Sequence, residues 1–180
     1  YGVDKWAGEK YHLIYHTTYG LKACSLRINN TYGPRHQMKH GKYGILNYFI
    51  RLAFLGETIK VFTPGTQMRD YNYISDVVDA MLLADSPKAD GEIFLLGSGR
   101  PISLLEMAKK VVEMGREFGL DASYTLVPWP EERKSIEVGD FFVSFEKFSR
   151  TFGWKPRVSL EEGLRKTFEF YRQKKDKYIL

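Results

Sequence analysis

Segments with the apolar spacing of a helix alternate along this chain with short runs that have the composition of buried strands. Apolar residues recur at helical spacing in 3–19, 44–56 and 105–114, and glycines or capping residues mark where these segments begin or end. Shorter apolar segments between the helices are predicted to be strands: 22–28, 59–62, 69–74, 93–96 and 124–127. This alternation is typical of α/β folds, so we predict an α/β chain.

Polar and turn-forming residues follow the first predicted strand directly. Residues 29–36 read Asn-Asn-Thr-Tyr-Gly-Pro-Arg-His, which predicts a turn-rich loop. A helix, a strand and a loop in this order make half of a doubly wound unit, in which ligands bind beyond the carboxyl ends of the strands. The sequence therefore predicts a ligand site near residues 29–36.

Local signals mark the starts of several helices. Capping boxes at 103–106 and 159–162 predict two helix N-termini. Ser75 and Asp76 are predicted to cap a helix over 77–84. Trp6, Leu13 and Ile14 stand at helical spacing in the first helix. In the last helix, Leu164, Phe168 and Tyr171 are predicted to point inward.

Composition narrows the classes of protein to which the chain can belong. With 180 residues, 43% of them hydrophobic, it can bury a substantial core. The net charge of +5 comes from scattered basic residues, so no nucleic-acid partner is predicted. No apolar run is long enough to span a bilayer, and no secretory leader is visible. The single cysteine fits a reducing compartment, and we expect a cytoplasmic protein with no membrane partner.

Tyr1 and Lys5 stand four residues apart, which puts both on one helix face with Cβ atoms ~5–6 Å apart. A tyrosine ordinarily loses its proton near pH ~10. An ammonium about 4 Å away favours the ionised form, a base, by ~4 kcal/mol at an effective dielectric of about 20. Tyr171 and Lys175 share the spacing in a charge-rich end segment, where a solvated helix face explains it. Spacing alone therefore does not identify a catalytic pair.

Other polar residues also allow two interpretations. Asn30 fits a ligand contact or a simple turn residue. Arg69 fits an anion contact or a surface ion pair with Asp70. His12 and His16 have a spacing that can hold zinc, but no third ligand accompanies them, and we predict no metal site.

Four segments together carry a more specific pattern: Tyr1–Lys5 with Glu9, Leu26–Arg35, Met68–Asp76 and Phe152–Pro156. In this order they resemble the extended short-chain dehydrogenase/reductase family, in particular its NAD-dependent nucleotide-sugar epimerases and dehydratases. The resemblance covers essentially the whole chain but only the second half of a family member. It implies the C-terminal part of a Rossmann-like doubly wound domain plus a smaller α/β substrate-binding lobe.

The resemblance also implies how the chain divides. Residues 1–31 would end the dinucleotide-binding domain, and 32–180 would form mainly the sugar-nucleotide-binding lobe, with about 69–99 returning to the Rossmann-like sheet. No Gly-rich phosphate loop follows a strand in these residues. That loop, with the rest of the N-terminal cofactor-binding half, is expected upstream of Tyr1, so that NAD would be bound mainly there.

Residue roles follow from the same resemblance. Tyr1 would be the catalytic base that takes a proton from a sugar hydroxyl. Lys5 would favour the ionised form of Tyr1 and hydrogen-bond the nicotinamide ribose, so both residues would be catalytic and cofactor-binding. Asn30, Arg69 and Arg133 would bind the diphosphate of a nucleotide-diphosphate sugar.

The expected function is oxidation of a sugar hydroxyl to a transient keto-sugar by an NAD-dependent epimerase or dehydratase. The 180 residues alone are expected to be inactive. Two alternatives remain: a non-catalytic remnant or interaction module of the same fold, and a reductase acting on a non-sugar substrate. A homodimer is also expected, formed through helices 3–19 and 44–56.

Overall fold

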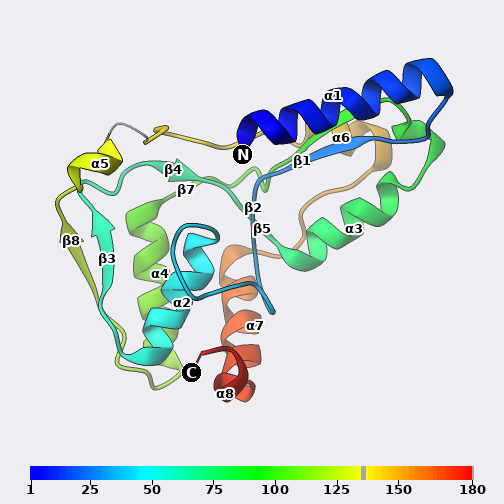
Figure 1. Cartoon of the computed structure of the whole chain (residues 1–180). Coiled ribbons are helices and arrows are strands. Elements are labelled where there is room, and N and C mark those ends of the chain that lie inside the picture. Colours follow the sequence, from blue (N-terminus) through cyan, green and yellow to red (C-terminus); the bar gives the residue numbers. More distant parts are fainter. Residues whose placement is uncertain (135–136, 180) are drawn as a thin grey trace.

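The computed structural model describes residues 1–134 and 137–179, with the side chains of Arg133 and Lys134 excepted (Figure 1). The helices are α1 (Gly2–Tyr19), α2 (Ile45–Leu55), α3 (Ile74–Ala84), the 3-10 helix η1 (Pro87–Ala89), α4 (Leu104–Glu117), α5 (Glu131–Lys134), α6 (Glu146–Phe152), α7 (Leu160–Gln173) and α8 (Lys175–Tyr178). The strands are β1 (Ser25–Ile28), β2 (Asn30–Tyr32), β3 (Ile59–Phe62), β4 (Met68–Arg69), β5 (Tyr71–Tyr73), β6 (Ile93–Leu96), β7 (Ile102–Ser103) and β8 (Tyr124–Val127).

The strands pair in twos, and most pairs are parallel. β1 pairs with β6 so that Ser25 lies opposite Ile93 and Ile28 opposite Leu96. β2 pairs with β5 and β3 with β8 in the same parallel sense, while β4 and β7 are antiparallel. Parallel strands separated by helices confirm the predicted α/β class.

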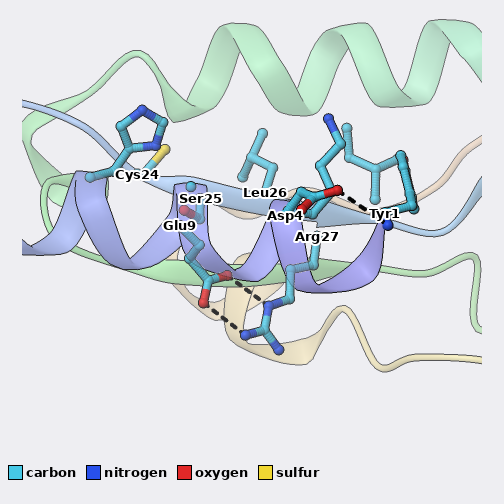
Figure 2. A pocket seen from close by; sticks show the side chains of 11 residues that line it. Tyr1, Asp4, Glu9, Cys24, Ser25, Leu26 and Arg27 are labelled. Carbon is cyan, nitrogen blue, oxygen red and sulfur yellow. Dashed lines mark hydrogen bonds and ion pairs between the residues drawn. The ribbon is translucent and has the colours of Figure 1, made fainter.

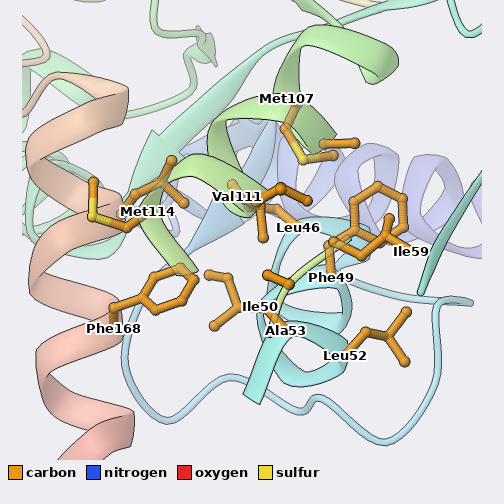
Figure 3. Packing of buried hydrophobic residues seen from close by; sticks show 14 of the residues in the cluster. Leu46, Phe49, Ile50, Leu52, Ala53, Ile59, Met107, Val111, Met114 and Phe168 are labelled. Atoms are coloured by element: carbon orange, nitrogen blue, oxygen red, sulfur yellow. The ribbon is translucent and has the colours of Figure 1, made fainter. Parts of the chain in front are cut away.

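The larger core lies where α2, α4 and α7 pack together (Figure 3). Phe49 and Ile50 of α2 meet Val111 of α4, and Phe168 comes in from α7. A second cluster, centred on Phe94, lies against β6 and includes residues of α3 and α6. The first core supports the lobe that carries β4 and β5, and the second supports the β1–β6 pair.

The predicted caps of α4 and α7 are confirmed. Ser103 Oγ accepts a hydrogen bond from the Glu106 amide at 3.1 Å, and Ser159 does the same for Glu162 at 3.1 Å. The predicted inward residues of the last helix, Leu164, Phe168 and Tyr171, are all buried.

The predicted cap of α3 is wrong. The helix begins at Ile74, so Ser75 and Asp76 lie inside its first turn. Asp76 Oδ2 instead accepts hydrogen bonds from the amides of Arg157 and Val158, at 3.1 and 3.0 Å. The carboxylate serves a distant segment, which local sequence does not reveal.

The helix predicted over 3–19 is confirmed as α1, but its apolar residues are largely exposed within the described chain. Trp6 is 57% exposed and Ile14 is 55% exposed, and Glu9 is the one buried residue among the described residues of this helix. The reason is that no other described element packs over the apolar side of α1. Periodicity identified the helix but not the side that faces its neighbours.

Helix α2, one of the two segments expected at a dimer surface, is largely packed within the described chain. Every residue of Ile45–Leu55 is buried or half-buried, because α2 packs against α4. Of the two segments, α1 alone retains exposed apolar side chains. Among residues 1–134 and 137–179, no helix has the length and hydropathy needed to cross a bilayer.

Candidate active site

Helix α1 lies along β1, and a cleft of about 700 Å³ separates part of the two elements (Figure 2). Its walls come from residues between Tyr1 and His12 of the helix and from residues 24–28 of the strand segment. The chain leaves β1 at Ile28 and continues directly into β2. The cleft therefore reaches the carboxyl end of β1, where α/β sheets bind ligands.

Tyr1 and Lys5 lie together in this cleft, as their spacing predicts. Lys5 Nζ is 5.6 Å from the centroid of the Tyr1 ring, and the ring is open to solvent, with Tyr1 82% exposed. Asp4 Oδ2 is 3.3 Å from the amino nitrogen of Tyr1. Within the described residues, no carboxylate lies at ion-pair distance from Lys5 Nζ, so the ammonium is available to a ligand.

Glu9, one turn beyond Lys5, forms a bidentate ion pair with Arg27 of β1 (Figure 2). Arg27 Nε donates to one carboxylate oxygen and Nη2 to the other, both at 2.8 Å. Arg27 holds the pKa of Glu9 below its ordinary value, chiefly through these hydrogen bonds and against the opposing effect of burial. The carboxylate is therefore charged at neutral pH.

Asn30 lies in β2 beside β5 and not in a simple turn. Its Nδ2 donates to the backbone oxygen of Asp70 and to Asn29 Oδ1, each at 3.2 Å. The bond to Asp70 holds the Asn30 amide beside the residue that follows Arg69 in the chain. The structure thus brings two of the predicted phosphate-binding residues, Asn30 and Arg69, into one region.

Asp70 does not form the surface ion pair with Arg69 that the sequence allowed. Its carboxylate is fully buried and accepts hydrogen bonds from the Ser98 amide at 3.0 and 2.9 Å, and another from the Ser98 hydroxyl. Ser98 follows β6, so this contact ties the end of β6 to the start of β5. Nothing local to Asp70 in the sequence indicates Ser98 as its partner.

Arg69 is engaged by residues from a distant segment. Its Nη2 lies 2.7 Å from Glu137 Oε1, and Nη1 donates to the Met68 oxygen at 2.9 Å. The Arg69 side chain is only 18% exposed. The guanidinium therefore sits in a partly enclosed, hydrogen-bonded position.

A cavity of about 350 Å³ next to Arg69 has Glu137 and Trp129 in its wall. The Trp129 ring packs on Phe62, with centroids 4.6 Å apart and planes 34° apart. The aromatic pair joins β3 to the segment after β8. The Pro-Trp-Pro corner at 128–130 was a usable sequence signal for a ring on a stiff support, and the ring is half-buried.

Comparison with known proteins identifies the family. The description "NAD dependent epimerase/dehydratase family" matches residues 1–97, which is more than half of the chain. The chain belongs to this family. The motifs in the sequence predicted the same assignment, and the α/β fold agrees with it.

Similar proteins include nucleotide-sugar enzymes of several kinds. A UDP-glucose 4-epimerase of Mycolicibacterium smegmatis is 34% identical over 177 residues, covering 97% of this chain and 53% of the relative. UDP-glucuronic acid decarboxylase 3 of Arabidopsis thaliana is 30% identical over 165 residues, covering 91% of this chain and 45% of the relative. This epimerase/dehydratase family chain thus spans about half the length of the curated relatives that it matches.

Solved structures of the family have a similar fold. The crystal structure of the Thermotoga maritima UDP-glucose 4-epimerase with UDP-glucose superposes with a TM-score of 0.85 at 34% identity. The match covers 97% of this chain and 53% of that one. The architecture is therefore that of the Rossmann-like epimerases and dehydratases.

Two further predictions concern residues at the margin of the site. The Arg133 side chain lies outside the described residues, although its backbone belongs to α5. His16 Nδ1 lies 2.8 Å from the Leu21 oxygen, and His12 lines the cleft beside α1. Within the part of the chain that the structure describes, no three His, Cys, Asp or Glu residues are grouped to hold a metal ion.

Proposed function

We propose that this chain provides the substrate side of an NAD-dependent nucleotide-sugar epimerase or dehydratase, which oxidises a sugar hydroxyl to a transient ketone. The observation that carries the proposal is the position of Tyr1 and Lys5, in a cleft that ends where β1 leads into Asn30. A ligand beyond the carboxyl end of β1 would meet both the pair and Asn30. Membership of the epimerase/dehydratase family supports the same reaction class.

Tyr1 acts as the base in this proposal. Its phenolate oxygen takes the proton of the sugar hydroxyl while the hydrogen on the same carbon leaves as hydride, and the C–O bond becomes C=O. Lys5 places a positive charge beside Tyr1, with its ammonium 5.6 Å from the ring centroid. Return of the proton through Tyr1 completes the reverse step.

NAD supplies the hydride acceptor and donor when it is bound. The residues present fit one end of such a cofactor: the cleft has a volume of about 700 Å³, and Lys5 is free to hydrogen-bond a ribose hydroxyl. The 180 residues contain no Gly-rich phosphate loop. We therefore assign most of the NAD contacts to polypeptide outside these residues, next to 1–31 and 69–99.

Asn30, Arg69 and Arg133 bind the diphosphate of the substrate in this proposal. A guanidinium presents a planar fork of donors that suits phosphate oxygens. The Arg69 guanidinium is held by the Met68 oxygen and by Glu137. The Asn30 amide is held by the backbone oxygen of Asp70, the residue after Arg69. The ring of Trp129, in the neighbouring cavity, offers a flat apolar surface for the nucleotide base.

The reaction branch is left open because the relatives include an epimerase and a decarboxylase. A nucleotide-diphosphate sugar is the shared substrate class. We also propose a homodimer that uses the exposed side of α1, where Tyr11 is 65% exposed and Ile14 is 55% exposed. Sedimentation of the gene product with and without Ile14→Glu tests that dimer.

Substitution of Tyr1 tests the proposed function directly. The intact gene product, incubated with NAD and UDP-glucose or UDP-glucuronic acid, should convert at least one sugar nucleotide. Tyr1→Phe should abolish turnover while substrate affinity by calorimetry stays unchanged. Tyr19→Phe, at the far end of the same helix, is the matched control and should keep full activity. Turnover retained by Tyr1→Phe would remove Tyr1 from the mechanism.

A further inference from the structure

Helix α1 is held to the rest of the described chain mainly by charge. Glu9 is its one buried residue there, and its apolar residues Trp6 and Ile14 are more than half exposed. A helix docked by an apolar face resists rotation through many contacts, but within the described residues α1 buries no such face. Within these residues, the contact made by Glu9 is therefore the most buried one that α1 makes with β1.

The contact between Glu9 and Arg27 is a bidentate ion pair that joins α1 to β1. Both carboxylate oxygens of Glu9 accept hydrogen bonds from Arg27, each at 2.8 Å, and the Glu9 side chain is 6% exposed. Arg27 belongs to β1, whose register with β6 places it opposite Leu95. Lys10 adds a weaker contact, with Nζ 3.7 Å from Glu9 Oε1. The two planar groups thus fix the helix to a strand that is itself fixed.

Glu9 lies on the same helical stripe as the proposed catalytic pair. Tyr1, Lys5 and Glu9 succeed each other at intervals of four residues, and all three line the cleft. Side chains reach ~5–6 Å from a helix axis, so a rotation of α1 by about 10° displaces the Tyr1 ring by ~1 Å. Displacements of about 1 Å are enough to cost a reaction as much as ~100-fold in rate.

We infer that Glu9 and Arg27 are positioning residues, which set the rotation of α1 and so aim Tyr1 and Lys5 at the substrate. The inference rests on the proposed function for its catalytic consequence. Neither Glu9 nor Arg27 is assigned a contact with the sugar nucleotide. Their effect should therefore fall on turnover and not on substrate binding.

The alternative is an ordinary surface ion pair, which contributes at most about 1 kcal/mol and orients nothing. The chain offers a matched example. Arg165 of α7 and Glu117 of α4 also join two elements, with Nη2 and Oε2 2.7 Å apart, but both side chains are about half exposed. Glu117→Gln is therefore the control for Glu9→Gln.

The first measurement is hydrogen exchange of the backbone amides in the intact gene product, followed by mass spectrometry. In Glu9→Gln, the peptides covering residues 2–19 should exchange about tenfold faster, because local opening of α1 becomes easier. Arg27→Lys, which keeps the charge but not the fork, should give a smaller increase. Glu117→Gln should leave these peptides unchanged. Unaltered exchange of α1 in Glu9→Gln would overturn the inference.

The second measurement separates positioning from loss of fold. Glu9→Gln should lower kcat about 10- to 100-fold with KM unchanged within about twofold. The stoichiometry of sugar-nucleotide binding by calorimetry should remain that of the wild type. A stoichiometry that falls in step with kcat would reduce the pair to a folding role. If the wild type itself turns over no sugar nucleotide, the proposed function fails. The exchange experiment still tests whether the Glu9–Arg27 pair holds α1 in place.

Discussion

Arg69 and Glu137 form an ion pair across 68 residues of sequence, with Nη2 and Oε1 2.7 Å apart. The pair occupies the guanidinium that the proposed function assigns to a substrate phosphate. A bound diphosphate must share Arg69 with Glu137 or displace it, because two anions compete for one fork of donors. Under the proposed function, Glu137 is therefore expected to weaken binding of the sugar nucleotide.

Glu137→Gln should tighten sugar-nucleotide binding by the intact gene product. The expected gain is up to about fivefold, because an ion pair near the surface is worth at most about 1 kcal/mol. Titration calorimetry with UDP-glucose measures it. Glu92→Gln, which removes a similar pair with Lys147 at a remote site, is the control. Weaker binding by Glu137→Gln would show that Glu137 supports the site.

Arg69→Ala should weaken sugar-nucleotide binding by ~1.5–3 kcal/mol, the usual range for a charged hydrogen bond. Removal of a surface arginine elsewhere, as in Arg165→Ala, should leave the affinity unchanged. The same calorimetric titration decides the matter. An unaltered affinity in Arg69→Ala would return this residue to the role of an ion-pair partner.

Local features of the sequence predicted much of this structure. The capping boxes at 103–106 and 159–162 and the Tyr1–Lys5 spacing depend on residues within one helical turn, so their geometry follows from the helix itself. The strands 59–62, 93–96 and 124–127 were equally clear from their apolar composition.

Partners far apart in sequence could not be predicted in the same way. The sequence suggested an ion pair between the neighbours Arg69 and Asp70. In the structure, Asp70 accepts hydrogen bonds from Ser98, and Arg69 forms its ion pair with Glu137. Adjacent residues of an extended strand point to opposite faces, so neighbours in sequence rarely pair there. Their partners depend on which segments the tertiary fold brings to each face.

The 180 residues by themselves should bind no NAD, because they contain no Gly-rich phosphate loop after a strand. Calorimetric titration of this chain with NAD should give no heat beyond dilution. The intact gene product, titrated in parallel, should bind the cofactor. Micromolar binding by the 180 residues alone would place the main cofactor contacts within them.

Acid should remove the contribution of the Glu9–Arg27 pair to stability. Arg27 lowers the pKa of Glu9 below 4.5, so the folded state binds this proton less readily than the unfolded state. The stabilisation is therefore complete above pH 4.5 and is lost as the pH falls through the lowered pKa. Urea unfolding should show Glu9→Gln less stable than the wild type at pH 7 by about 1–3 kcal/mol, with the difference shrinking towards pH 3. A constant difference would exclude titration of Glu9 as the cause.

Substitution of Gly97, which follows β6, tests the Asp70–Ser98 contact that ties β6 to β5. A Cβ at this position would lie 1.9 Å from the Val143 oxygen and 2.6 Å from Asp70 Oδ2. Gly97→Ala should therefore destabilise the fold by about 1–3 kcal/mol, because a backbone oxygen has to move and the Asp70–Ser98 hydrogen bonds are strained.

Gly8→Ala is the control for this substitution, since nothing lies within 4 Å of the added methyl group and alanine favours a helix. Urea unfolding of both variants measures the difference. Because Asp70 also holds the Asn30 amide through its backbone oxygen, Gly97→Ala should weaken sugar-nucleotide binding as well. A Gly97→Ala variant with wild-type stability would show that the segment at Val143 moves aside at little cost.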